Sequence, residues 1–222
     1  MARKSIDAPH RDVFLANEKE VKRLLDIHSQ ITKSGPGHKP DVEVLNKSAL
    51  ILLVATWESY VEELATNSFD FLIENCYGPD DIPNSILAMS SRKLRESKNE
   101  LDVWKLAEEG WIDVVVSHRD SVIKKYISSL NTPRTENVDE VFYALLGVKN
   151  ISKNWYWKGM SNANAKEKLE SLIKTRGEIA HTVRASKPVT KTKVNEYAVF
   201  LNRLATITHN RCVSQLVKVC RV

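Results

Sequence analysis

Ala49-Leu-Ile-Leu-Leu-Val-Ala-Thr-Trp57 is the longest apolar run of the chain. It is well short of the roughly 20 residues that a membrane-spanning helix needs, so we expect a buried helix rather than a membrane segment. Asp41 can cap this helix, which continues through Phe71 until Tyr77-Gly-Pro79 ends it. Because nearly every side of the helix is apolar between residues 49 and 55, we predict that it is the long central helix of the fold.

The sequence on both sides of this helix carries the same helical spacing of apolar residues. Further helices are predicted over residues 11–32, 85–97, 111–130, 137–147, 162–183 and 191–219. Strand-type alternation is nowhere sustained, and no Gly/Ser/Pro-rich linker divides the chain. We therefore predict an all-α fold, a single-domain helical bundle over residues 1–222 with a poorly ordered N-terminus at about residues 1–10.

Composition limits the function only weakly. Thirty-three Lys and Arg against 28 Asp and Glu give a formal charge of +5 and a pI near 9.0, which is compatible with nucleic-acid binding. Cys76, Cys212 and Cys220 have no zinc-ligand spacing, and we expect reduced, structural thiols. The polar N-terminus offers no apolar core for a signal peptide, so we expect a cytoplasmic protein that does not bind membranes.

The segment Arg176-Gly-Glu-Ile-Ala-His181 breaks the pattern of its helix. Arg176 falls in the middle of an apolar stripe formed by Ala165, Leu169, Leu172, Ile173, Ala180 and Val183. Glu58 interrupts the apolar stripe of the central helix in the same way. A buried guanidinium needs a partner or a function, so we predict that Glu58 holds Arg176. A pair that only fixes helix register is the alternative.

The neighbours of Arg176 give weaker signals. His181 lies about 140° around the helix from Arg176, at the rim of the apolar face; taken alone, it is more often an ordinary histidine. Gly177 costs about 1 kcal/mol relative to Ala inside a helix, and would let a backbone or a phosphate come close.

Arg176-Gly-Glu-Ile-Ala-His181 resembles the Arg-x-x-x-x-His signature of HEPN domains, all-α proteins found as ribonucleases in toxin–antitoxin and antiviral systems. Leu45-Asn-Lys-Ser-Ala-Leu-Ile-Leu-Leu-Val-Ala-Thr-Trp-Glu-Ser-Tyr60 resembles the second helix of the RiboL-PSP branch of this family. Val141-Phe-Tyr-Ala-Leu-Leu-Gly-Val148 is also similar to that branch. The resemblance extends from about Val21 to Val219.

The resemblance implies that Arg176 and His181 are catalytic, with Glu58, Gly177 and Glu178 in supporting roles. In the family the residue after the arginine is commonly polar, often asparagine, whereas here it is Gly177. Glu178 matches the frequent family wording Arg-Asn-Glu-Ile-Ala-His. A solvated partner of Lys174 or Thr182 is the other interpretation of Glu178.

The chemistry of metal-free RNA cleavage fits these residue types. Histidine can transfer the proton of the 2′-hydroxyl and arginine can stabilise the charge on phosphorus, and no carboxylate cluster favours two-metal chemistry. HEPN enzymes work without a metal or cofactor, leave 2′,3′-cyclic phosphate and 5′-hydroxyl ends, and dimerise so that both motifs line one cleft. We expect single-stranded RNA as the substrate, with Trp155, Trp157 and Arg184 as further contacts. Packing in the core or at an interface is the alternative for the tryptophans.

Three functions remain open from the sequence. The first is an endoribonuclease of HEPN type, acting as a toxin or antiviral-defence effector that an antitoxin protein could silence. The second is a non-catalytic HEPN module that binds RNA, a nucleotide or a partner protein. The third is a structural helical dimer with a buried pair of Arg176 and Glu58.

Overall fold

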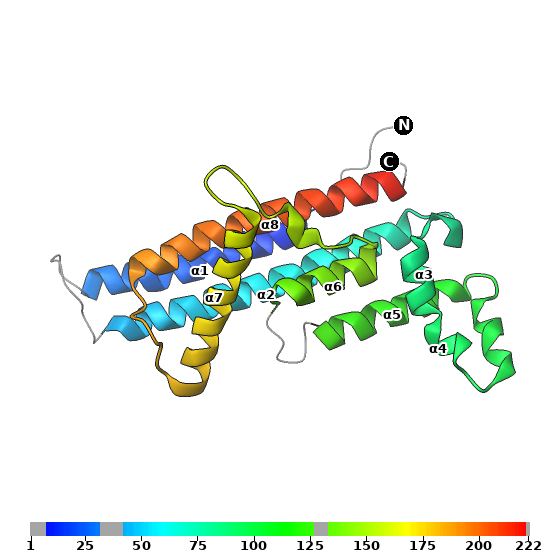
Figure 1. Ribbon diagram of the computed structural model, residues 1–222, viewed down its shortest axis with the longest axis horizontal. Coiled ribbons are helices and arrows are strands. Elements are labelled where there is room, and N and C mark those ends of the chain that lie inside the picture. Colours follow the sequence, from blue (N-terminus) through cyan, green and yellow to red (C-terminus); the bar gives the residue numbers. More distant parts are fainter. Residues whose placement is uncertain (1–7, 32–41, 127–132, 221–222) are drawn as a thin grey trace. The chain divides into compact units, whose positions relative to one another are not determined.

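The computed structural model describes residues 8–31, 42–126 and 133–220. The helices within these ranges are α1 (Pro9–Ile31), α2 (Glu43–Glu74), η2 (Pro79–Asp81), α3 (Asn84–Ser90), α4 (Arg92–Arg95), η3 (Glu100–Leu106), α5 (Gly110–Tyr126), α6 (Thr135–Leu146), η4 (Ile151–Asn154), α7 (Asn162–Thr182) and α8 (Lys191–Val219) (Figure 1). The described ranges contain no β-strand, only an isolated bridge between Trp157 and Met160. The all-α prediction is confirmed.

The predicted helix boundaries differ from the structure in a few places. The helix expected over residues 85–97 is two helices, α3 and α4, separated at Ser91. The 3-10 helix η3 was not predicted, because its apolar residues, such as Leu101 and Trp104, face solvent and give no buried stripe. Pro9 and His10 begin α1 and His10 is buried, so these two residues do not belong to a poorly ordered terminus. Residues 1–7, and the expected helix end at residue 130, lie outside the described residues.

The chain packs as two compact units. Unit 1 is built from Glu62–Asn154 and from the chain beyond Thr208, and unit 2 comprises Ala8–Val61 and Trp155–Ile207. The helices α2 and α8 run without interruption from one unit into the other. Because of this continuity, the division does not test the prediction of a single domain.

Unit 2 is centred on an aromatic cluster. Trp57 of α2 stacks on Tyr60 and meets the edge of Trp155, each at a ring-centroid distance of 6.1 Å. Phe14 of α1 packs against Tyr60 at 5.0 Å, and the Tyr60 hydroxyl donates a hydrogen bond of 2.7 Å to the carbonyl of Ala205 in α8. This cluster joins α1 to the N-terminal half of α2 and to α8, which lie side by side in unit 2 (Figure 1). The predicted central role of the apolar run is confirmed in part, since Leu50, Leu53 and Val54 are buried whereas Leu52 is 43% exposed.

Unit 1 has its own apolar core. Phe69 and Leu72 of α2, Ile86 of α3 and Phe142 of α6 are almost fully buried. Gly147 ends α6 with a φ of 68°, a left-handed conformation that glycine adopts without strain. None of the helices in the described ranges is both long enough and apolar enough to span a membrane.

Candidate functional site

The motif helix α7 has clear start and stop signals. The Ser161 hydroxyl accepts a hydrogen bond of 3.2 Å from the backbone N–H of Asn164, which satisfies one of the free donors at the helix start. At the other end, Val183 adopts a left-handed conformation with a φ of 59° and donates its N–H to the carbonyl of Ile179. Left-handed geometry is unfavourable for a β-branched residue. The motif therefore occupies the last two turns before a strained helix end.

The apolar face of α7 is covered only in part. Ala165, Leu169, Leu172 and Ile173 are buried as predicted, but Ala180 is exposed and Val183 is 71% exposed. At about 100° per residue these two residues share a face with Leu169. The predicted stripe is therefore wrong at its C-terminal end, because unit 2 covers this face over the early turns of α7 and leaves most of it open near the motif. Figure 1 shows this end of α7 projecting past α2.

Arg176 and His181 both lie on the open end of α7. Arg176 is half-buried rather than enclosed in the apolar stripe, and His181 is exposed in the last helical turn. The two residues are separated by about 7.5 Å along the helix axis and about 140° around it.

Glu58 lies in α2 and is half-buried. The ion pairs found within the described ranges do not include one between Glu58 and Arg176. The pairing of these two side chains therefore stays a prediction, without support from the structure.

Glu178 forms a hydrogen bond with the segment that follows α7. Its Oε2 atom accepts a hydrogen bond of 2.8 Å from the backbone N–H of Ser186. The Ser186 side chain and this backbone bond together lower the pKa of the carboxyl. The Thr182 hydroxyl donates to the Glu178 carbonyl at 2.7 Å and accepts from the N–H of Arg184 at 3.3 Å. The Glu178 side chain is thus occupied by a structural contact with the segment after the helix.

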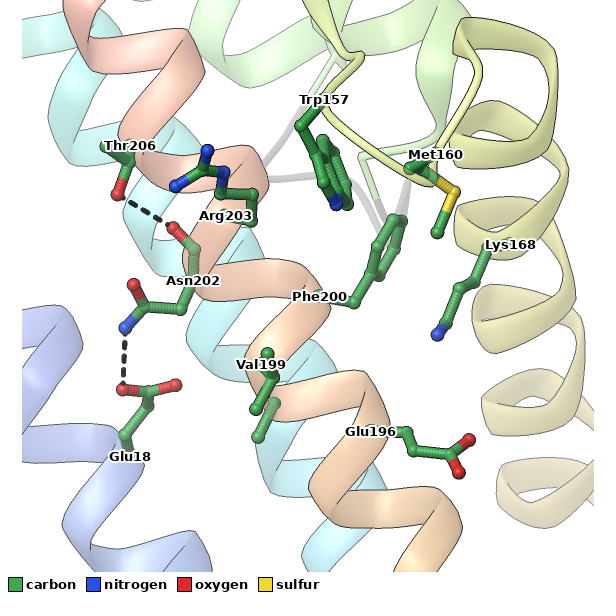
Figure 2. Close-up of a pocket in the computed structure, with 11 residues that line it drawn as sticks. Glu18, Trp157, Met160, Lys168, Glu196, Val199, Phe200, Asn202, Arg203 and Thr206 are labelled. Carbon is green, nitrogen blue, oxygen red and sulfur yellow. Dashed lines mark hydrogen bonds between the residues drawn. The ribbon is translucent and has the colours of Figure 1, made fainter.

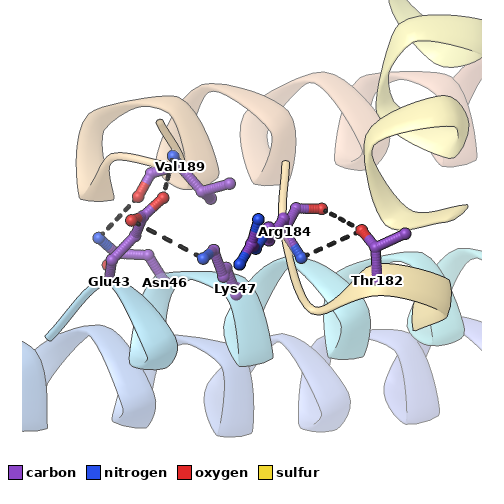
Figure 3. Close-up of polar contacts among 6 residues, drawn as sticks. All are labelled: Glu43, Asn46, Lys47, Thr182, Arg184 and Val189. Atoms are coloured by element: carbon purple, nitrogen blue, oxygen red, sulfur yellow. Dashed lines mark hydrogen bonds and ion pairs between the residues drawn. The ribbon is translucent and has the colours of Figure 1, made fainter. Parts of the chain in front are cut away.

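The same segment is anchored to the beginning of α2 (Figure 3). Glu43 accepts the N–H of Val189 at 3.1 Å, and the Asn46 side chain donates to the Val189 carbonyl at 2.9 Å. Lys47 pairs with Glu43 at 3.7 Å. The Arg184 residue lies on this anchored segment and is exposed, so its guanidinium is accessible from solvent.

Most of the chain matches the model of a known protein family. The family model described as RiboL-PSP-HEPN matches residues 14–214, which includes all of α2 and α7. The chain belongs to the RiboL-PSP-HEPN family. The family resemblance predicted from the sequence is confirmed. No curated protein and no solved structure is significantly similar to the chain.

The two tryptophans next to the motif helix of this HEPN protein have different environments. Trp155 is fully buried against Trp57, so the prediction that it stacks on a base is wrong and core packing is its role. Trp157 is half-buried, with its ring 6.1 Å from that of Phe200, and it exchanges two backbone hydrogen bonds with Met160. Trp157 alone of the two can offer a ring face to a ligand.

A cavity of about 670 Å³ opens beside Trp157 (Figure 2). Its lining comes from α1, α7, α8 and the segment before α7, and consists of Glu18, Trp157, Met160, Lys168, Glu196, Ala198, Val199, Phe200, Asn202, Arg203 and Thr206. Of these lining residues, Trp157 was predicted from the sequence as a ligand contact and the others were not. No local pattern could have found them, because separate segments of the HEPN chain assemble the cavity.

The described cysteines and possible metal ligands do not form a second reactive site. All three cysteines are free, as expected. Burial raises the pKa of Cys212, and burial together with the nearby Cys76 and Asp81 raises the pKa of Cys220 to about 11. Both thiols are therefore protonated and poorly nucleophilic at neutral pH. Within the described ranges, no group of three or more His, Cys, Asp or Glu residues could hold a metal ion.

Proposed function

We propose that this HEPN protein is a metal-independent endoribonuclease, with Arg176 and His181 as catalytic residues. Attack of the 2′-hydroxyl on the adjacent phosphorus would leave 2′,3′-cyclic phosphate and 5′-hydroxyl ends. The observation that carries the proposal is the placement of Arg176 and His181 at the open end of α7 in a chain of this family. The cellular role that we propose is that of a toxin or antiviral-defence effector, with an antitoxin protein as its candidate regulator.

The proposed chemistry divides between the two side chains. His181 is exposed and can exchange a proton with the ribose or with water. Arg176 presents a permanently charged fork of N–H donors that suits the oxygens of a phosphate in the transition state. A Cβ atom built on Gly177 would have nothing within 4 Å, so a phosphate can approach the helix backbone at this position.

We also propose that the enzyme acts as a homodimer. One chain supplies a single Arg176 and a single His181, whereas two chains related by a two-fold axis would supply two of each to one cleft. The open face of α7, with exposed Ala180 and Val183, provides apolar surface for this contact. Ala180→Glu should therefore convert dimers into monomers in analytical ultracentrifugation. A dimer unchanged by this charge would place the interface elsewhere.

Cleavage of total cellular RNA in the presence of EDTA tests the enzymatic proposal. Wild type should cut RNA, and Arg176→Ala and His181→Gln should not, while all three proteins keep the same circular dichroism spectrum. Arg23→Ala is the matched control, because Arg23 is an exposed arginine on α1 of the same unit. The fragments should accept a 5′ phosphate from polynucleotide kinase without prior phosphatase treatment. Equal cleavage by all four proteins would identify a contaminating nuclease and contradict the proposal.

A non-catalytic RNA-binding module is the second candidate, and Gly177 is the observation that favours it. The family commonly has a polar residue, often asparagine, at this position, and glycine lacks such a side chain. If this loss weakens catalysis, Gly177→Asn should increase the cleavage rate, since the position has open space for a side chain. RNA binding without cleavage, by wild type and by Gly177→Asn alike, would favour the binding module.

A further inference from the structure

The cavity of unit 2 has an aromatic wall flanked by cations. Trp157 and Phe200 form the wall, and the Lys168 Nζ atom lies 5.2 Å from the centroid of the Phe200 ring. Arg203 extends from α8 on the side of Trp157 away from Lys168 (Figure 2). An aromatic surface between positive charges is the combination that proteins use to bind single-stranded nucleic acid, because bases stack on the ring and phosphates meet the cations.

Hydrogen-bonding groups line another part of the same cavity. Glu18 of α1 accepts a hydrogen bond of 3.1 Å from the Asn202 side chain of α8. Glu18 is half-buried, and this burial raises the pKa of its carboxyl. A carboxylate has about four acceptor positions, and Asn202 fills one of them. Glu18 therefore retains acceptor capacity for a ligand that donates N–H groups.

We propose that this cavity is a base-binding subsite for single-stranded RNA and that it prefers guanine. The proposal rests on the RNA-cleaving function proposed above and names its substrate more closely. Guanine presents two neighbouring N–H donors on its Watson–Crick edge, which a carboxylate can accept together. Adenine, cytosine and uracil place an acceptor beside their donor and would meet repulsion from Glu18. Stacking on Trp157 would hold the base, with the flanking phosphates at Lys168 and Arg203.

The dimensions and charges of the cavity agree with this occupant. Its volume of about 670 Å³ lies within the range of roughly 300–1,000 Å³ typical of small-molecule sites. Glu196 also lines the cavity and would repel a phosphate. Lys168 and Arg203 lie on opposite sides of Trp157, so each can meet one of the two phosphates that flank the base, and the two acids Glu18 and Glu196 make a purely acidic peptide a poor occupant.

The cavity and the motif share the helix α7. Lys168 and Arg176 both lie on α7, eight residues apart, which corresponds to about 12 Å along the helix axis. A strand of a few nucleotides spans this distance. A guanine held in the cavity would therefore place the cleaved phosphate a fixed number of nucleotides away.

Binding of labelled pentaribonucleotides to His181→Gln protein, which keeps the oligonucleotides intact, tests the subsite. The probes are UUGUU, UUAUU, UUCUU and UUUUU. We expect UUGUU to bind about ten-fold more tightly than UUUUU, and Glu18→Gln to remove this preference without weakening UUUUU. Trp157→Ala should weaken all four probes about ten-fold or more. Equal affinity for the four probes, or a preference unchanged by Glu18→Gln, would overturn the proposal.

Matched variants control for general effects. Trp104→Ala removes a tryptophan that is 72% exposed in unit 1, and Glu20→Gln removes an exposed carboxylate from α1. Neither should change binding. Arg203→Ala should weaken all probes equally and lower the dependence of binding on salt, by a slope of about 0.7 for one phosphate of a single strand. If Arg203→Ala left the salt dependence of binding unchanged, Arg203 would not contact a phosphate, which would contradict the proposed placement of the flanking phosphates.

Cleavage measurements separate this proposal from the proposed function. RNA cleavage by wild type with the same cut positions in Glu18→Gln would retain the nuclease and reject the guanine subsite. Guanine-dependent binding without any cleavage by wild type would retain the subsite and reject the nuclease. Loss of positional preference in Glu18→Gln, with cleavage still dependent on His181, would support both.

Discussion

The Glu178 carboxylate accepts a hydrogen bond of 2.8 Å from the backbone N–H of Ser186, eight residues further along the chain. This bond ties the segment after α7 to the middle of the motif. The anchoring of Val189 by Asn46 then connects the same segment to α2. The open end of α7 is thus held in place by hydrogen bonds of the segment that follows it, although Ala180 and Val183 on its apolar face are exposed. Such support keeps Arg176 and His181 positioned without burying them.

We predict that the chemical shift of the Ser186 amide changes with pH as the Glu178 carboxylate gains or loses its proton. The Ser186 side chain and the hydrogen bond from the Ser186 backbone N–H lower the pKa of the carboxyl below its ordinary value of 4.5. The stabilisation from this bond is therefore present above pH 4.5 and lost as the pH falls through the lowered pKa of the folded protein. The amide chemical shift of Ser186 should titrate with a midpoint below 4.5 in wild type and should not do so in Glu178→Gln. Glu167→Gln, an exposed acid on the same helix, should leave the titration unchanged.

Gly177→Ala should stabilise the protein. Gly177 lies inside α7 with a helical backbone and open space at its Cβ position, so alanine gains helix propensity without a clash. The expected gain in the free energy of unfolding is about 1 kcal/mol, measured by urea denaturation. Gly159→Ala is the control of opposite sign, because Gly159 has a φ of 84° that alanine adopts only with strain. A destabilised Gly177→Ala would mean that another group already occupies the space.

Val183→Gly should also stabilise the protein, for a different reason. Val183 ends α7 at a φ of 59° and is 71% exposed, so glycine relieves backbone strain and removes little packing within the monomer. Strain of about 1–2 kcal/mol, less the extra entropy of a glycine in the unfolded chain, leaves an expected gain of about 0.5–1 kcal/mol. Val199→Gly, at an exposed valine inside α8, should destabilise instead. Similar effects at both valines would show that the left-handed geometry of Val183 carries no strain.

The sequence predicted the long helices well because they have buried apolar residues and recognisable ends, whereas α4 and η3 contain no buried residue and were not predicted as separate helices. Gly147 and the Pro-containing segment after Ala185 ended helices where expected. The fate of single side chains was predicted less well, because burial depends on which neighbour covers a face. Trp155 was predicted to contact RNA and is buried, whereas Val183 was predicted to lie on a buried stripe and is exposed. The cavity could not be predicted at all, since Glu18 and Asn202 are 184 residues apart in the chain.

Glu18→Gln should reveal whether the carboxylate of the cavity is kept for binding at the expense of stability. Burial raises the pKa of Glu18 above its ordinary 4.5, and the bond from Asn202 only partly opposes this. For an acid with a raised pKa in the folded state, the protonated form is favoured by folding. Stability is then greatest below pH 4.5 and is lost as the pH rises through the raised pKa.

Glutamine cannot ionise and avoids this loss. Glu18→Gln should therefore be more stable than wild type at pH 7, and the difference should disappear below pH 4.5 in urea denaturation series across pH. Glu20→Gln, on an exposed turn of α1, should show no such change. If Glu18→Gln were less stable at pH 7, the charged carboxylate would already have a strong partner within the protein. A gain in stability together with a loss of guanine preference would show that this charge serves the ligand rather than the fold.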